Sequence, residues 1–375
     1  MSPGRRLVGN DLMVDEALRD NMRIRSLLLA AIMTLSSLSV VIASDTITTQ
    51  DVDISGNYTM TGNYTVSHGT TLTIKPGSTI DMQDYWMKVE GTLIVDNSTI
   101  MSSIQTTSPG GHNAGVWDSL TIASGGTATL DNVTISNAKS CMIIDGAISA
   151  KSLTIEDCLI GIEVSGTADI SGLSVESVDN DGVRVSGAAT LSQVDILYAT
   201  AGISSSGDLV VTEGEFQQVG TGVSLDGGTA DIEDLDFISG VGNAVSIASN
   251  VSGDIDGMTG ISGNSIVAID STGFQISNIN MSGKRLVNSW SAGDLTISNA
   301  TYFADSSETP IDLRTSGTVV LSEISLTGQF STFQGSYSAP WIGIAIAGSG
   351  DYLISDSHIE ATDYAVKASG TGTLS

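Results

Sequence analysis

Acidic residues recur in the middle of the chain at an interval that could create a cation site. Asp195, Glu215 and Asp236 follow one another at steps of about 21 residues, and Glu213 and Asp234 form a parallel pair just before the last two. If such positions stack in neighbouring strands about 4.8 Å apart, their like charges repel unless they are screened or bridged. Calcium would bridge them through carboxylate oxygens. A solvated acidic face in salty surroundings would need only screening, and the sequence leaves both alternatives open.

A second candidate site is aromatic and lies in an insertion. Residues 102–116 and 327–340 both interrupt the repeat described below, and each precedes a strand that begins with Trp. The second insertion carries Phe330, Phe333 and Tyr337. Exposed aromatic rings there could stack on sugars or dock a protein; the alternative is that they pack back against the core. We expect the two insertions to project from the same edge.

The residue patterns of common catalytic sites do not occur in the sequence. Its three His residues are scattered, and neither Gly-x-Ser-x-Gly nor a phosphate-binding loop is present. Arg184, with Glu163 one repeat earlier, is the one arrangement that resembles the basic group and acidic neighbours of a lyase. A surface ion pair is the alternative. We therefore assign no catalytic residue.

The two cysteines are expected to remain unpaired. Cys141 and Cys158 lie about three residues out of phase within their repeats, so stacking alone would not bring them together. No group of His residues accompanies them, which argues against a metal site.

The elements that must position all these residues belong to one repeat. Its unit is apolar-x-apolar-x-x-apolar-x-apolar, followed by a turn and a second short strand, as in Ala168–Val175 and Ala189–Ile196. The alternation of apolar residues is typical of β-strands, and Gly, Ser, Asp and Asn fill the turns. We predict an all-β fold, a right-handed parallel β-helix of about 14 coils with 20–24 residues each, which buries Val, Ile and Leu between coils.

The amino-terminal region has the layout of an export signal. Arg23 and Arg25 precede an apolar run over residues 27–42, and small residues follow at Ala43 and Ser44. We expect residues 1–43 to be a leader and signal peptide, with an uncleaved amino-terminal anchor as the alternative. Residues 44–63 are expected to lead in to the helix and residues 64–375 to form it. Because the sequence stops as a new coil begins, we also expect truncation at the carboxyl terminus.

The charge limits the partners of the chain. Its formal net charge is −28, and only nine Lys or Arg residues follow Asp45. Such a surface repels phosphate backbones, so we expect no nucleic-acid partner. No later apolar run is long enough to span a bilayer. An extracellular or cell-surface location is therefore expected.

Seven Asn-x-Ser/Thr sequences are candidate glycosylation sites, which would suit a surface protein. Several would arise by chance in a chain so rich in Ser and Thr. The acceptor residues are Asn57, Asn63, Asn97, Asn132, Asn250, Asn280 and Asn299.

Two runs near the start of the repeat carry a family resemblance. Gly69–Gly77 reads Gly-x-Thr-Leu-Thr-Ile-x-Pro-Gly, and Val89–Leu93 reads Val-Glu-Gly-Thr-Leu. These runs resemble the first coils of right-handed parallel β-helix proteins of the pectate-lyase-like superfamily, found on microbial and particularly archaeal surfaces. Pectate-degrading members would be expected to show Asn-x-Asp, Asp-Asp, Gly-His-Gly and Arg-x-Lys; Asp-Asp is missing and Gly111-His112-Asn113 only approaches Gly-His-Gly.

The resemblance and the composition together predict a secreted or surface module with a structural, adhesive or glycan-binding role. Its partners would be polysaccharides, other glycans or components of the cell envelope. The alternative is a calcium-assisted polysaccharide lyase or glycoside hydrolase; the only cofactor that the sequence suggests is calcium, through the acidic residues.

Overall fold

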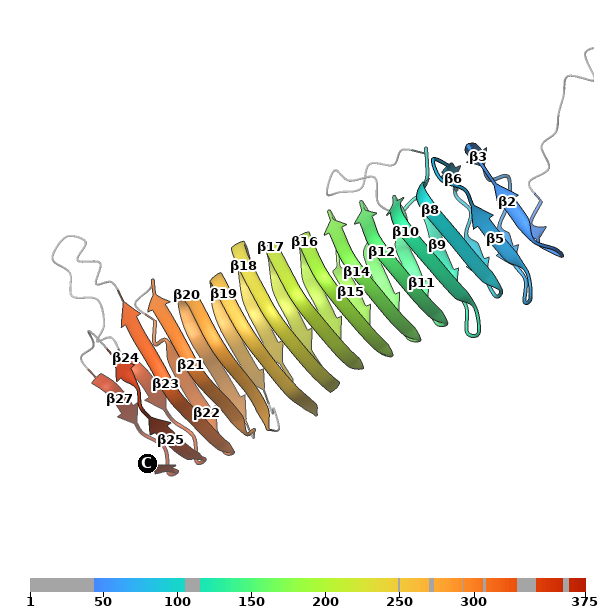
Figure 1. Ribbon diagram of the computed structural model, residues 1–375. Coiled ribbons are helices and arrows are strands. Elements are labelled where there is room, and N and C mark those ends of the chain that lie inside the picture. Colours follow the sequence, from blue (N-terminus) through green and yellow to red (C-terminus); the bar gives the residue numbers. More distant parts are fainter. Residues whose placement is uncertain are drawn as a thin grey trace, which may run out of the picture. The chain divides into compact units, whose positions relative to one another are not determined.

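A computed structural model describes residues 44–104, 115–248, 250–269, 273–291, 293–305, 308–328, 342–359 and 364–375. These residues form 28 β-strands that pair in parallel and no helix, so the predicted right-handed parallel β-helix of about 14 coils is confirmed (Figure 1). Nothing in this described part of the chain is a helix that could cross a membrane. By its contacts the chain divides into two units, Met1–Ser44 and Asp45–Ser375.

Each coil has three faces, which one coil illustrates. Strand β14 (Thr167–Glu176) follows face A to Ser171, bends at Gly172 and continues along face B, and β15 (Asp181–Val185) forms face C. The next coil repeats these positions in parallel register, with Ile170 opposite Leu191 and Val183 opposite Ile203. The predicted repeat is therefore one turn of the helix. The A/B, B/C and C/A corners are the bends between the faces.

Strand length grows along the chain from the first coils to the middle ones. Seven short strands come first: β1 (Thr46–Ile47), β2 (Val52–Ile54), β3 (Asn57–Thr59), β4 (Tyr64–Val66), β5 (Thr71–Ile74), β6 (Thr79–Asp81) and β7 (Met87–Val89). Because β1, β2 and β3 already pair in parallel with β4, β5 and β6, the ladder extends into the lead-in segment. Longer strands then join faces A and B, with face C separate: β8 (Thr92–Met101), β9 (Trp117–Ile122), β10 (Thr127–Ser136), β11 (Ala138–Ile144), β12 (Ala147–Glu156) and β13 (Ile160–Val164).

In the middle coils single strands run through all three faces. They are β16 (Ala188–Ser205), β17 (Asp208–Leu225), β18 (Gly228–Ile247), β19 (Val251–Ile269) and β20 (Phe274–Ser291). The last coils return to shorter strands: β21 (Leu295–Ala304), β22 (Ile311–Thr315), β23 (Thr318–Gly328), β24 (Ile342–Ile346), β25 (Asp351–Ser355), β26 (His358–Ile359), β27 (Tyr364–Ala368) and β28 (Thr373–Leu374).

The core is a set of apolar columns that run between coils. Alternate residues of the longer strands point inward and are buried, as the pattern predicted, whereas the short strands β1, β3, β27 and β28 contain no buried residue. Phe216 and Phe237 stack with ring centroids 5.4 Å apart. A Cβ atom on Gly202 would lie 2.7 Å from the Phe216 ring, and one on Gly222 would lie 2.5 Å from the Phe237 ring. The glycines thus provide the volume that the two large rings occupy.

Cys141 and Cys158 form a disulfide bond, with their Cα atoms 5.9 Å apart, so the prediction that they stay unpaired is wrong. Both side chains are fully buried. Cys141 lies on β11, and Cys158 lies at the B/C corner just before β13. Their difference in phase within the repeat describes only their separation along the chain and not their distance in space. Because the chain bends at this corner, two inward side chains that are out of register still converge across the interior.

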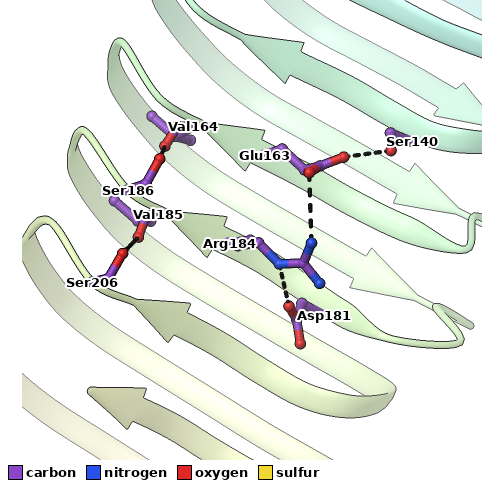
Figure 2. Close-up of polar contacts among 8 residues, drawn as sticks. All are labelled: Ser140, Glu163, Val164, Asp181, Arg184, Val185, Ser186 and Ser206. Carbon is purple, nitrogen blue, oxygen red and sulfur yellow. Dashed lines mark hydrogen bonds and ion pairs between the residues drawn. The ribbon is translucent and has the colours of Figure 1, made fainter. Parts of the chain in front are cut away.

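The C/A corner brings neighbouring backbones into close approach. Ser-Gly pairs occupy it in successive coils, at Ser186-Gly187 and Ser206-Gly207 for example. The Ser186 and Ser206 hydroxyls donate to the carbonyl oxygens of Val164 (3.3 Å) and Val185 (3.5 Å) in the preceding coil (Figure 2). A Cβ atom on Gly187 would lie 2.3 Å from the Gly166 carbonyl oxygen. Glycine is therefore required there by lack of space.

Candidate functional site

The A/B corner places one residue of each coil in the left-handed backbone region. Glycine adopts this conformation freely and Asn or Asp tolerates it, whereas other residues pay about 1 kcal/mol or more. Most coils use the tolerant types, and the exceptions are Ser, Gln and Glu. These residues form what we call the left-handed column: Gly77, Asn97, Asn132, Ser152, Gly172, Gln193, Glu213, Asp234, Gly257, Asn278, Asn299, Glu323 and Asp356.

A second line of side chains runs parallel to this column on face B. Each of its members stands two residues after the left-handed residue and points outward, because the residue between them points into the core. Register pairs connect them from coil to coil: Thr79, Thr99, Thr134, Thr154, Ser174, Asp195, Glu215, Asp236, Thr259, Asn280, Thr301 and Ser325. We call this line the outward row, and the strip between row and column the furrow.

The amino-terminal part of the furrow is hollowed and uncharged. A groove of about 270 Å³ is lined by Gly77, Ser78, Thr79, Asn97, Ser98, Thr99, Asn132 and Thr134. The Asn132 side-chain amide donates to Asn97 Oδ1 at 2.7 Å, so these two members of the left-handed column orient each other. Three threonine hydroxyls remain available along the outward row, one per coil. This part can therefore offer regularly spaced donors and acceptors without a charge.

The middle of the furrow has the same form and an acidic lining. A groove of about 430 Å³ is lined by carboxylates of both lines together with Gln193, Val194 and Gly214. Asp195, Glu215 and Asp236 are direct register partners in the outward row. Partial burial raises the pKa of the Glu215 carboxyl, and the neighbouring Asp195 and Asp236 raise it further. The carboxylates thus repel one another as the sequence spacing suggests.

The acidic groove does not have the geometry of a closed metal site. Among the residues that the structure describes, no three His, Cys, Asp or Glu side chains converge so that they could hold a metal ion. Glu213 and Asp234 lie in the left-handed column, across the furrow from the outward row. Asp236 instead accepts a hydrogen bond from the Thr259 hydroxyl at 2.9 Å. The five residues predicted to bind a cation therefore share one groove without forming a coordination shell.

Beyond the acidic stretch the furrow carries amides and hydroxyls as far as Asn299, and Glu323 and Asp356 follow in the left-handed column. Asn299 donates to Asn278 Oδ1 at 2.6 Å, and Asn278 donates to Asp256. The Ser277 hydroxyl also donates to Asp256 Oδ1, at 2.7 Å. The Asn299–Asn278 contact thus repeats the Asn132–Asn97 contact on the opposite side of the acidic stretch.

The geometry of the A/B corner accounts for several of the Asn-x-Ser/Thr sequences. At Asn97, Asn132 and Asn299 the Asn is a left-handed residue, the next residue points inward, and the Thr two positions later belongs to the outward row. The Asn132 and Asn299 amide nitrogens are already engaged as donors. Corner geometry therefore generates the Asn-x-Thr pattern. Of the other candidates, Asn57, Asn250 and Asn280 are exposed, and Asn63 accepts a hydrogen bond from the Trp86 backbone at 3.3 Å.

Arg184 on face C lies in an ion-pair network (Figure 2). Its Nε donates to Asp181 Oδ2 at 2.7 Å, and its Nη1 lies 3.6 Å from Glu163 Oε2 in the preceding coil. Glu163 also accepts a hydrogen bond from Ser140 at 2.6 Å. The guanidinium therefore stands between two carboxylates. The surface ion pair is the better interpretation of this motif, because the half-exposed guanidinium is held by carboxylates on both sides.

The aromatic candidates Phe330, Phe333 and Tyr337 lie outside the described residues. The strands next to the two insertions do correspond: β8 and β23 end on face B, while β9 and β24 follow on face C. Trp117, which begins β9, is fully buried, and its indole nitrogen donates to the Ser136 carbonyl at 2.8 Å.

The furrow as a whole was not predicted from the sequence, although a signal for it exists. In the coils after the first ones the left-handed residue follows the second apolar position of the repeat by two residues, as Asn132 follows Leu130 and Asn299 follows Ile297. The recurrence of Asn, Asp or Gly at that place marks a left-handed corner.

Comparisons with known proteins give architecture only. No family model matches the sequence. A search of curated proteins found no match either. Solved structures do match, at low identity. The catalytic unit of a GH87 α-1,3-glucanase from Streptomyces thermodiastaticus is 14% identical with a TM-score of 0.48, and the match covers 86% of this chain and 64% of the glucanase chain.

Two further matches are an enzyme of another kind and an adhesin. The A-module of an Azotobacter vinelandii mannuronan C-5 epimerase is 11% identical with a TM-score of 0.37, covering 86% of this chain and 90% of the other. A surface adhesin of Streptococcus pneumoniae is 9% identical with a TM-score of 0.36, covering 87% and 91%. Because identities and TM-scores are this low, the fold assignment rests on the strand register of this chain, and the site must be interpreted from its own geometry.

Proposed function

We propose that this chain is an extracellular β-helix module that binds an extended glycan along the furrow. The observation that carries the proposal is the repetition of hydrogen-bonding groups along the A/B corner, one set per coil, in grooves of about 270 and 430 Å³. Sites for small molecules are mostly enclosed and apolar. A polar strip that repeats at about 4.8 Å suits a polymer of hydroxyl-bearing units.

Two features support export of the chain. The apolar run after Arg23 and Arg25 has the layout of a signal segment. The buried Cys141–Cys158 disulfide suits an oxidising compartment, because thiols are kept reduced in the cytosol. An adhesive or structural role on a cell surface would follow from glycan binding at such a location.

The experiment that tests the proposal compares two matched variants in binding to polysaccharides. Thr99→Ala with Thr134→Ala removes two hydroxyls from the furrow, and Thr129→Ala with Thr190→Ala removes two from exposed positions on face A. Each lost hydrogen bond is worth about 1 kcal/mol, so the furrow variant, which loses two, should bind about thirtyfold more weakly. The face A variant should bind like wild type. Equal binding by both variants would contradict the proposal.

A glycoside hydrolase or lyase is the second candidate. Its support is the raised pKa of Glu215 between two carboxylates, a property of catalytic acids in glycosidases. Release of reducing ends from a bound polysaccharide, lost in Glu215→Gln, would establish it. Calcium dependence is tested separately by the melting temperature in a calcium titration. A rise that Asp195→Asn, Glu215→Gln and Asp236→Asn together abolish would assign cation binding to the acidic groove.

A further inference from the structure

The furrow changes charge along its length, although the same two lines of residues border it throughout. The groove that contains Thr99 and Asn132 has no ionisable side chain in its lining. The groove that contains Glu215 is lined by five carboxylates and by no Lys, Arg or His. Both lie between the same two lines of residues, so a polymer that follows the furrow passes from an uncharged stretch into an acidic one.

Among the described residues that line the acidic stretch, none on the other side of the furrow is basic. Asp195 faces Gln193, and Glu215 and Asp236 face Glu213 and Asp234. A ligand with its own carboxylate or sulfate groups would bring further negative charge to within one coil spacing of these residues. Hydroxyl or amine groups would instead form hydrogen bonds with them, and an amine would also reduce their mutual repulsion.

We propose that the furrow takes glycans that lack acidic groups and rejects polyanionic polysaccharides, with Asp195, Glu215 and Asp236 as the residues that set this specificity. The inference rests on the proposed function and adds the class of ligand. The uncharged groove supplies hydrogen bonds to the polymer, and the acidic groove excludes uronate and sulfated chains.

The test uses pairs of polymers that share a backbone and differ in charge. Hydroxyethyl cellulose is compared with carboxymethyl cellulose, and dextran with carboxymethyl dextran, by retardation of the protein in gels that contain each polymer. EDTA is present so that divalent cations cannot bridge carboxylates. Wild type should bind at least one neutral polymer about tenfold more tightly than its carboxymethyl partner, because each added charge meets several fixed ones.

Two charge-matched variants assign the effect to the furrow. Asp195→Asn, Glu215→Gln and Asp236→Asn together should reduce the preference to less than about threefold. Asp169→Asn, Asp231→Asn and Asp254→Asn together remove the same charge from exposed positions on face A and should keep the preference. A preference lost equally in both variants would reflect net charge alone and overturn the inference.

The outcomes separate this inference from the function on which it rests. If wild type binds neutral and carboxymethyl polymers equally in EDTA, while Thr99→Ala with Thr134→Ala weakens both, the furrow binds glycans and the charge selection is wrong. If no polymer in either pair retards wild type, the proposed function fails and the inference fails with it.

Discussion

The A/B corner and the C/A corner close the same coils by opposite means. At the A/B corner each coil holds one residue in the left-handed region with its side chain outward, and this residue can be Asn, Gln, Glu or Asp. At the C/A corner the backbones approach so closely that a Cβ on Gly187 or Gly207 would fall 2.3 or 2.1 Å from a carbonyl oxygen. The outward side chain at the A/B corner can therefore vary from coil to coil, whereas the glycines of this close approach cannot be replaced freely.

This difference explains where a ligand site can develop on the solenoid. The apolar columns limit the inward positions, and the Ser-Gly pairs limit the C/A corner. The left-handed column is limited only in its backbone conformation, which leaves the functional group free. The change from amides to carboxylates between Asn132 and Glu213 occurs without any change of fold.

The largest expected loss of stability follows from adding a side chain at the C/A corner. Gly187→Ala should lower the free energy of unfolding by about 3 kcal/mol, because the new methyl group meets backbone atoms that cannot move independently. Gly77→Ala is the control at the A/B corner, where nothing lies within 4 Å of the added Cβ. It should cost about 1 kcal/mol from its backbone conformation alone. Equal urea midpoints for the two variants would contradict the contrast.

The B/C corner extends the comparison, because a disulfide bond crosses the interior at this corner in one coil. Replacing Cys141 and Cys158 together by Ala should lower the free energy of unfolding by about 3 kcal/mol, as expected for a closed loop of this length. The measurement is urea unfolding without reductant. An unchanged midpoint would mean that coil stacking alone holds this corner.

A smaller loss of stability is expected when a residue that resists the left-handed conformation is placed in the left-handed column. Asn132→Val should cost about 2 kcal/mol, since a β-branched residue resists this conformation and the contact to Asn97 is lost. Asn132→Gly loses the same contact but keeps a permitted conformation, so it should cost less. A valine variant as stable as the glycine variant would show that backbone conformation does not limit this corner.

The smallest effect concerns charge within the furrow. Partial burial, then Asp195 and Asp236, raise the folded-state pKa of Glu215 above the usual 4.5. The folded state then binds the proton more tightly than the unfolded state, so stability falls as pH rises from about 4.5 through the raised pKa. Glu215→Gln should remove this decline, so the melting temperature of the variant should change less between pH 4 and pH 7 than that of the wild type. Added salt should weaken the difference, and identical profiles for wild type and variant would refute it.

Most of the architecture could be predicted from the sequence because it depends on local periodicity. Alternation along a strand decides which side chains point inward, and a repeat of about 21 residues decides which of them stack. The register of Ile170 with Leu191, and of Asp195 with Glu215, follows from counting alone. The acidic line was found in this way, since charge and spacing are both written in the chain.

What the chain does at its corners was decided by the tertiary structure. Cys141 and Cys158 are out of phase by residue number, yet they meet because the corner folds the chain across the interior. The furrow likewise needs two lines of side chains to stand on either side of a bend, and sequence spacing gives no angle for that bend. The amino-acid sequence determined which residues share a column; only the path of the backbone around each coil decided which columns face one another.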